Sequence, residues 1–380
     1  MTGSSLRLLT ASTLAIATIA ASASGVLASG DLASCTLQPK EGDTPDNTGA
    51  ILEAAVALSA GDVWVMGSHV VGPGSSPSAQ HWNGSGWTKA ELDLPPRGIS
   101  VSSIYDARAF SSDDVWAVGS WEGELPFVQH WNGKAWSAVR VPAMPGDEQI
   151  LTGIDGTGPD DIWVVGERHE AGQEHGLVLH YDGARWSVIQ PPQGAAVVHD
   201  VTMSGSNPTV VGWSIGPTGF AQGIVATHAG SAWQVAAIPN DAHRNLFLLG
   251  TASATPGGTW AVGFSNDSPN RDTAHVYQQT GDAWQEVPVP DLGGSARLLG
   301  VATEAQGTVV VGQVLLNGIE RAVVLRASAN GWEEIPGSGD HAPDTLAGVT
   351  LQDGDVWAVG RGVVTGATYG VPSARVYACA

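Results

Sequence analysis

The sequence predicts an all-β fold, a seven-bladed β-propeller built from four-stranded antiparallel blades. An apolar run that ends in glycine occurs seven times, and a tryptophan after a short polar turn occurs six times, each followed by a proline. A period of about 50 residues is typical of a supersecondary unit that buries its apolar face only by stacking against its neighbours. The repeated glycines are Gly67, Gly119, Gly166, Gly212, Gly263, Gly312 and Gly360.

Each repeat contains four short strands. In the second repeat we expect them at 104–110, 115–120, 127–131 and 136–141, with polar turns between them. Asn83-Gly84, Asn132-Gly133 and Asp182-Gly183 stand between the third and fourth strands of their repeats. Asn-Gly and Asp-Gly are strong hairpin signals, because both residues tolerate a positive φ. Four strands per repeat, repeated around a ring, predict a propeller with only short sheet edges.

Tryptophan and histidine recur at fixed positions of the repeat. The second strand carries Trp64, Trp116, Trp163, Trp260 and Trp357, with Thr209 and Val309 at the same position of the fourth and sixth repeats. The third strand carries His81, His130, His180 and His228. A residue that recurs in every blade lies in a ring rather than in one cluster, so we interpret both sets as packing residues.

The seventh repeat ends after three strands, so its fourth strand must come from elsewhere. The segment 34–39 near the N-terminus has the pattern of a fourth strand and ends in a proline. We therefore expect one propeller domain over 29–380, with blades over 51–380 and a closing strand at about 34–39. This pairing would bring together the two cysteines of the chain, and we predict a disulfide between Cys35 and Cys379.

The repeat resembles a known family. In 162–192 an apolar strand ending in Gly166 is followed by Tyr181, Trp186 and Pro191, and this arrangement is similar to the kelch-type propeller repeat. The resemblance covers about 51–380 and implies the propeller fold, but no particular function. Kelch repeats usually carry two adjacent glycines, whereas here the position after the glycine holds other residues: Ser68, Ser120, Glu167, Trp213, Phe264, Gln313 and Arg361.

The N-terminus and the charge indicate where the protein acts. Residues 1–28 have a single Arg7, a short apolar stretch and small residues at candidate cleavage sites, as in a secretory signal peptide. We expect a secreted bacterial protein with no membrane span; lipidation of Cys35 in the lipobox-like 32–35 is the minor alternative. The net charge of −21 argues against nucleic-acid binding.

The loops that follow the second strands vary most in length and content, and they should open on one face together with the segments between blades. Aromatic, charged and amide residues in these loops suit a sugar, which presents apolar ring faces and hydroxyl groups. We expect no metal, cofactor or catalytic residue. The selected ligand-binding residues are Trp121, Glu122, Arg168, Trp213, Phe264, Asn266, Arg271, Arg361 and Tyr369.

The sequence therefore favours a secreted, non-catalytic binding propeller that recognises a glycan or a cell-surface polymer in a lectin-like way. A protein-interaction scaffold within a secreted, toxin-type or surface assembly is the alternative. A polysaccharide-active enzyme is a lesser alternative, because paired carboxylates that the fold brings together are invisible in the sequence.

Overall fold

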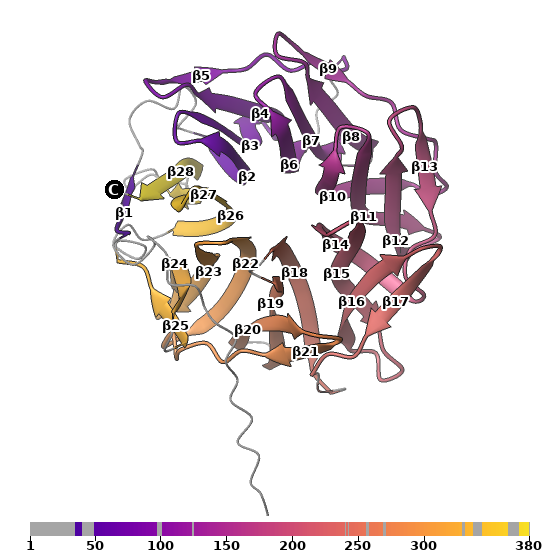
Figure 1. The fold of residues 1–380 in the computed structure, drawn as a ribbon, viewed down its shortest axis with the longest axis vertical. Helices are drawn as coiled ribbons and strands as arrows, with labels where there is room; N and C mark the ends of the chain where they lie inside the picture. Colours follow the sequence, from indigo (N-terminus) through magenta and orange to yellow (C-terminus); the bar gives the residue numbers. More distant parts are fainter. Residues whose placement is uncertain are drawn as a thin grey trace, which may run out of the picture.

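The chain forms a ring of seven four-stranded antiparallel sheets around an open centre (Figure 1), as the sequence predicts. The computed structural model describes residues 35–39, 49–96, 101–123, 125–239, 241, 243–255, 258–268, 271–328, 331–336, 344–363 and 372–379. The predicted signal peptide, residues 1–28, lies outside the described residues.

Each blade runs outward from the centre of the ring in chain order. The innermost strands are β2 (Ala50–Ser59), β6 (Ser103–Ser111), β10 (Glu148–Gly158), β14 (Ala195–Ser204), β18 (Asn245–Ala254), β22 (Ser295–Glu304) and β26 (Asp344–Gln352). The second strands are β3 (Asp62–Val71), β7 (Asp114–Trp121), β11 (Asp161–Glu170), β15 (Asn207–Ile215), β19 (Gly258–Ser268), β23 (Gly307–Leu316) and β27 (Asp355–Val363).

The third strands are β4 (Gly74–Trp82), β8 (Leu125–Trp131), β12 (Gln173–Tyr181), β16 (Ala221–Ala229), β20 (Arg271–Thr280), β24 (Ile319–Ser328) and β28 (Pro372–Cys379). The outer strands are β1 (Leu37–Pro39), β5 (Trp87–Lys89), β9 (Trp136–Ala138), β13 (Trp186–Ile189), β17 (Ala232–Ala236), β21 (Ala283–Glu286) and β25 (Gly331–Glu334). The outer strand of the second blade is shorter than the predicted 136–141, because the chain leaves the sheet on its way to the next blade.

The N-terminal strand closes the ring. β1 pairs antiparallel with β28, placing Leu37 opposite Cys379 and Pro39 opposite Tyr377, so the last blade takes its fourth strand from the start of the chain. The amide of Leu37 also donates to the carbonyl of Pro336, 3.1 Å away, which follows the sixth blade. The predicted closure is confirmed, and it joins segments from opposite ends of the sequence.

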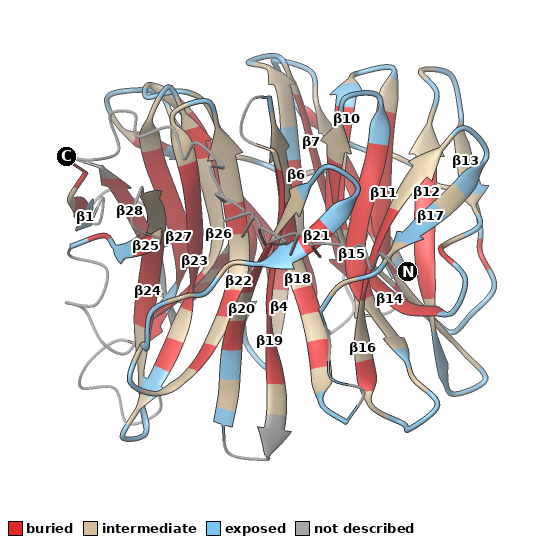
Figure 2. Ribbon diagram, turned by 60° about the horizontal axis from the view of Figure 1, so that its bottom comes forward, coloured by how far each residue is buried: buried red, intermediate tan, exposed pale blue. Residues whose placement is uncertain are grey.

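The repeated tryptophans and histidines are packing residues. Trp64, Trp116, Trp163, Trp260 and Trp357 are buried, with at most 6% of their surface exposed. In the first three blades the histidine ring stacks on this tryptophan at 4.3 Å between centroids and pairs with an aspartate at the start of the second strand. Buried residues fill the middle of the strands and exposed residues the loops at both ends (Figure 2).

A β-bulge occurs at the same place in every innermost strand. In β2 the pairing with β3 shifts between Leu52 and Ala54, so Glu53 is the extra residue, and Leu52 lies opposite the repeated Gly67. A Cβ on Gly67 would meet the carbonyl oxygen of Ile51 at 2.0 Å. A Cβ added to any of the other six repeated glycines would lie equally close, at 1.9 to 2.2 Å, to the corresponding carbonyl oxygen of its own blade. The glycine repeat is therefore the counterpart of a bulge on the neighbouring strand.

We predict that Gly166→Ala lowers the free energy of unfolding by about 3 kcal/mol, because the new Cβ would lie 1.9 Å from the carbonyl oxygen of Ile150 and the backbone must shift. Gly158→Ala in the same blade is the matched control, since a Cβ there meets nothing within 4 Å. Urea unfolding of both variants measures the difference, and equal midpoints would contradict the close approach.

The Cys35–Cys379 disulfide stays a prediction, because the side chain of Cys379 lies outside the described part of the structure. Cys35 is 6% exposed and packs in one cluster with Leu37 and Tyr377, and no described cysteine is free. The pairing of β1 with β28 brings the backbones of the two segments together. In the chain-entropy account, closing so long a loop stabilises the fold by about 5 kcal/mol.

We expect the intact mass of the purified protein to be two protons lower before reduction than after it. Two free thiols, or the added mass of a diacylglyceryl group on Cys35, would contradict the disulfide.

Candidate functional site

The seven bulges present one side chain each to the centre of the ring. The residue before each bulged position is fully buried, and the bulged residue itself lines a central cavity of about 820 Å³. Polar residues occupy the positions of blades one to four, and apolar residues those of blades five to seven. In chain order they are Glu53, Tyr105, Thr152, His199, Leu249, Leu299 and Ala347. The channel wall is thus half polar and half apolar.

Three aspartates of the channel join neighbouring blades. Asp106 accepts hydrogen bonds from the amides of Ala107 and Ile154, the latter in the next blade, at 2.8 Å each. Asp155 and Asp200 repeat this pattern, accepting from Met203 and Thr251 of the following blades at 2.7 Å. Each carboxylate spans one blade interface, so these aspartates hold the inner strands of blades two to five together.

Burial changes the charge of the channel. The loss of water raises the pKa of Asp106 to about 7, although its two backbone hydrogen bonds oppose the shift. The pKa of Asp200 is raised as well, by burial and by the nearby Asp106. Arg108 lies 3.1 Å from Asp155 and is the cation that partly balances this acidic wall.

Glu53 differs from the three aspartates. No described residue hydrogen-bonds its carboxylate, which projects into the channel from the bulge of the first blade. Burial raises its pKa to about 7, and the charge of Arg361 in the seventh blade opposes this rise. Glu53 is therefore an acid with no partner in the part of the chain that the structure describes, apart from this long-range attraction.

His199 occupies the bulge of the fourth blade. Its Nδ1 donates to the carbonyl of Leu249, the bulged residue of the next blade, at 2.8 Å. Burial lowers the pKa of His199, so the neutral ring is favoured. Donation from Nδ1 leaves Nε2 as the acceptor nitrogen of the neutral imidazole.

The mouth of the channel combines an aromatic arc with a polar arc. Trp213 contacts Phe247 edge-on at 5.2 Å between ring centroids, and Phe247 contacts Phe264 at 5.2 Å. Arg297 covers Phe264 at 4.7 Å from the ring centroid and pairs with Asp272 at 2.6 Å. These residues form the aromatic arc, which runs from the fourth blade to the sixth.

The polar arc lines a smaller recess of about 300 Å³ between the sixth, seventh and first blades. Thr345 donates to Gln313 at 2.8 Å and lies 3.2 Å from the carboxylate of Glu320. Glu53 and Arg361 complete the recess, one from each side. The arc thus offers two acids, an amide, a hydroxyl and an exposed guanidinium.

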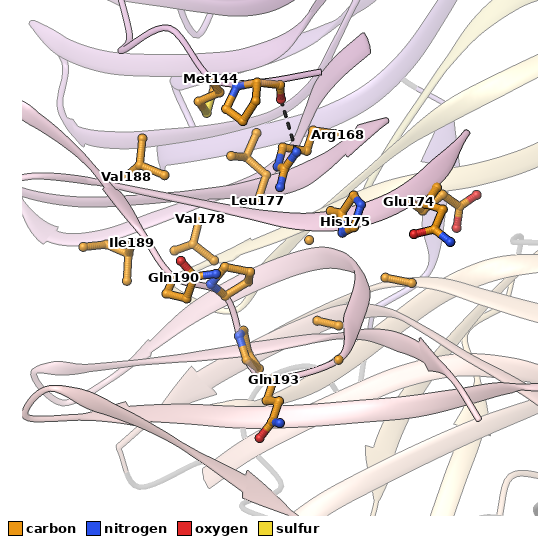
Figure 3. Close-up of a pocket in the computed structure, with 18 of the residues that line it drawn as sticks. Met144, Arg168, Glu174, His175, Leu177, Val178, Val188, Ile189, Gln190 and Gln193 are labelled. Carbon is orange, nitrogen blue, oxygen red and sulfur yellow. Dashed lines mark hydrogen bonds between the residues drawn. The ribbon is translucent and has the colours of Figure 1, made fainter. Parts of the chain in front are cut away.

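A second recess, the lateral groove, lies between the third and fourth blades and has a volume of about 970 Å³ (Figure 3). Leu177, Val178, Val188 and Ile189 make an apolar wall, while Glu174 and His175 at the start of β12 lie at the other side. Arg168 donates to the carbonyl of Pro145 at 3.3 Å and pairs with Glu170. The lateral groove includes the segment 190–194 between blades, whereas the polar-arc recess is lined by strand residues near the ends of second strands and the starts of innermost and third strands.

The structure brings some of the predicted ligand residues together and separates others. Trp213 and Phe264 share the aromatic arc, Arg361 belongs to the polar arc and Arg168 to the lateral groove. Asn266 accepts from Asn245 at 2.8 Å, beside Phe264 in the fifth blade. Arg271 is exposed at the start of β20, away from both recesses.

Two of the predicted aromatic residues are less accessible than expected. Trp121 is 6% exposed and stacks with Phe127 in the core, while Phe264 is 9% exposed under Arg297. Glu122 follows Trp121 in a turn with a positive φ, and its backbone amide donates to the hydroxyl of Ser102 at 2.8 Å. Tyr369 lies outside the described residues.

The sequence analysis did not find the channel residues Glu53, Tyr105 and His199. A weak signal exists, because every innermost strand contains a buried aliphatic residue, then a variable residue, then glycine, alanine or aspartate. Examples are Leu52-Glu53-Ala54 and Leu248-Leu249-Gly250. The middle residue of this triplet is the one that faces the channel.

Among the described residues, no group of three or more His, Cys, Asp or Glu is arranged to hold a metal ion. The described part of the chain also contains no helix with the length and apolarity needed to cross a membrane.

Comparison with known proteins identifies the fold. No family model and no curated protein matches the chain. Among solved structures, it is similar to YCF48 bound to D1 peptide, with 13% identity, a TM-score of 0.57 and coverage of 90% of this chain and 96% of that one. It is also similar to a PL25 ulvan lyase bound to -[GlcA(1-4)Rha3S]-, with 9% identity, a TM-score of 0.58 and coverage of 89% and 95%.

The six-bladed fungal lectin from Aleuria aurantia is more distant, with 11% identity, a TM-score of 0.49 and coverage of 77% and 98%. The chain is a seven-bladed β-propeller. Identities this low establish the fold and leave the kelch resemblance as an interpretation of the repeat.

The buried carboxyl of Glu53 predicts a pH-dependent stability. Its pKa of about 7 lies above the value of 4.5 for an unperturbed glutamate, so its protonation favours the folded state. This contribution is fully present below pH 4.5 and is lost as the pH rises to about 7. Glu53→Gln, which mimics the protonated form, should therefore be more stable than the wild type at pH 8, by about 2 kcal/mol, and similar to it at pH 5.

Urea unfolding at the two pH values measures this difference. Asp282→Asn, in the exposed turn between β20 and β21, removes the same charge and should leave the pH dependence unchanged. A Glu53→Gln variant with the pH dependence of the wild type would contradict the burial of this acid.

Proposed function

We propose that this chain is an exported, non-catalytic binding propeller that recognises a glycan or a cell-surface polymer. The observation that carries the proposal is that both recesses lie at the ends of the blades where second strands finish and innermost and third strands begin: Gln313 and Arg361 line the channel mouth, and Arg168 and Ile215 the lateral groove. The variable loops between second and third strands emerge at these same ends. These segments belong to one face of the ring. A polymer lying across this face would contact both recesses.

The side chains of the channel mouth suit a sugar. The aromatic arc offers the half-buried ring of Trp213, on which an apolar pyranose face can stack. In the sixth and seventh blades, Gln313, Thr345 and Arg361 offer hydrogen-bonding groups for hydroxyls. Concave sites that combine apolar surface with a small number of placed polar groups are typical of ligand sites.

A binding role accounts for the channel aspartates better than an enzymatic one. Asp106, Asp155 and Asp200 accept backbone hydrogen bonds from two successive blades, so they have a structural task. General acid–base catalysis needs a carboxyl free to exchange a proton with a substrate. A polysaccharide-active enzyme is the lesser alternative, and turnover of a glycan panel by the purified protein would support it.

A protein-interaction scaffold is the second candidate. The apolar wall of the lateral groove includes Val188, which is 52% exposed, and the exposed Ile215 lies beside it. A solved structure with a similar fold, YCF48, holds a peptide. A partner that co-elutes stably with the native protein from culture fluid, together with a silent glycan array, would favour this candidate.

Export is part of the proposal, and it rests on the signal-peptide pattern of residues 1–28. Lipid anchoring at Cys35 is the alternative to release from the cell. The mature protein, recovered from culture fluid, is therefore the material for the experiment.

We expect the mature protein to bind at least one polymer on an array of bacterial and fungal glycans. Trp213→Ala should weaken that binding by about tenfold, because a stacked sugar ring loses its aromatic partner. The matched control is Trp82→Ala, a half-buried tryptophan before the β4–β5 turn at the opposite face. Circular dichroism verifies that both variants fold. No binding to any polymer, or equal loss in both variants, would contradict the proposed site.

A further inference from the structure

Glu53 is the group in the channel that the fold itself does not use. The carboxylates of Asp106, Asp155 and Asp200 each accept two backbone amides, whereas no described residue hydrogen-bonds Glu53. It nevertheless faces both the central cavity and the recess at the channel mouth. Partial burial of an acid that the fold leaves without a hydrogen bond is costly, and an ion or a catalytic role is among the explanations for such a group.

The charges around Glu53 favour a cation. Arg297 is already paired with Asp272, and the carboxylate of Glu320 lies 3.2 Å from the hydroxyl of Thr345, so Arg361 is the remaining guanidinium of the recess. Deeper in the channel lie Asp106, Asp155 and Asp200, with Arg108 as their counterion. The whole chain carries a net charge of −21. The summed field therefore attracts positive ligands and repels anionic polymers.

We propose that the channel mouth binds a glycan that carries free amino groups, a de-N-acetylated hexosamine polymer, with Glu53 pairing with one ammonium group. The proposal rests on the glycan-binding function above and names its substrate class. One sugar ring of the polymer stacks on the aromatic arc, and an ammonium group on another ring enters the recess beside Glu53.

An aminosugar polymer fits this mouth better than a basic peptide does. The aromatic arc and the polar recess meet at Arg297, which covers Phe264 and lines the recess, so aromatic and hydrogen-bonding groups are both available to a polymer with apolar ring faces and hydroxyls. A lysine or arginine side chain would use the acid but would leave the amide nitrogen of Gln313 without a ligand acceptor, because the Thr345 hydroxyl already donates to the Gln313 oxygen.

Arg361 has the opposite role in this site. It is exposed at the rim of the recess and lies close enough to Glu53 to influence its charge. A bound ammonium would approach this guanidinium, and like charges repel. Arg361 thus limits the affinity for amines. Substitutions of Glu53 and of Arg361 should therefore change this affinity in opposite directions.

Isothermal titration calorimetry at pH 7 with two probes of equal length tests the proposal: the β-1,4-linked glucosamine hexamer and its fully N-acetylated counterpart. We expect the free amine to bind more tightly, by about tenfold, and its affinity to fall as salt increases. Glu53→Gln should weaken binding of the amine by about tenfold and leave binding of the acetylated probe unchanged. Arg361→Gln should strengthen binding of the amine by about threefold. Asp282→Asn, which removes a charge in the exposed β20–β21 turn, is the control and should behave as the wild type.

Each other outcome has a distinct meaning. Equal binding of both hexamers would overturn the role of the ammonium while leaving glycan recognition in place. Binding of neither hexamer, with another polymer bound on the array, would overturn the substrate class alone. A basic peptide that binds more tightly than both hexamers, with a silent array, would overturn this inference and the proposed function together. If Glu53→Gln fails to fold, Arg361→Gln still decides, since unchanged or weaker amine binding in that variant contradicts the site.

Discussion

The fold depends on the close approach of one glycine in each blade to a carbonyl oxygen of the innermost strand. At this point the chain has no room for a Cβ, because the oxygen would lie about 2 Å away in all seven blades. The approach exists because the innermost strand carries an extra residue. The carbonyl two residues before it, such as that of Ile51 before Glu53, points towards the glycine of the second strand. Glycine on one strand and a bulge on the other are therefore two sides of one interaction.

This interaction also creates the candidate site. A bulge leaves its extra residue outside the regular alternation of a strand, so the residue is free of the packing between blades. The residue before it is fully buried in every blade, while the bulged residue lines the channel and differs from blade to blade. The fold thus keeps one position constant and leaves the next one variable, seven times around the axis. Glu53, Tyr105 and His199 owe their place in the channel to this rule.

The sequence was sufficient for the repeat and the ring, but not for the channel. Gly166 and Trp163 recur because local geometry and packing demand one residue type, and such positions are visible in a single sequence. Bulged residues are visible only as a variable position, because no residue type is required there. The same limit explains Trp121, whose place in a variable loop predicted exposure while a neighbouring phenylalanine buries it. Residues about 50 positions apart meet in the channel, and only the closed ring brings them together.

The contrast between Glu53 and the channel aspartates shows how one chemical group takes two roles in the same channel. Asp106 and Asp200 directly follow the bulge, where a short side chain reaches the amide of its own successor and an amide of the next blade. Glu53 stands at the bulge itself and projects into the cavity, where no described amide meets its carboxylate. The two hydrogen bonds that each aspartate accepts offset the cost of removing its carboxylate from water, so the aspartates strengthen the blade interfaces. No hydrogen bond within the described chain offsets the desolvation of the Glu53 carboxylate. A ligand cation beside it would stabilise the charged form.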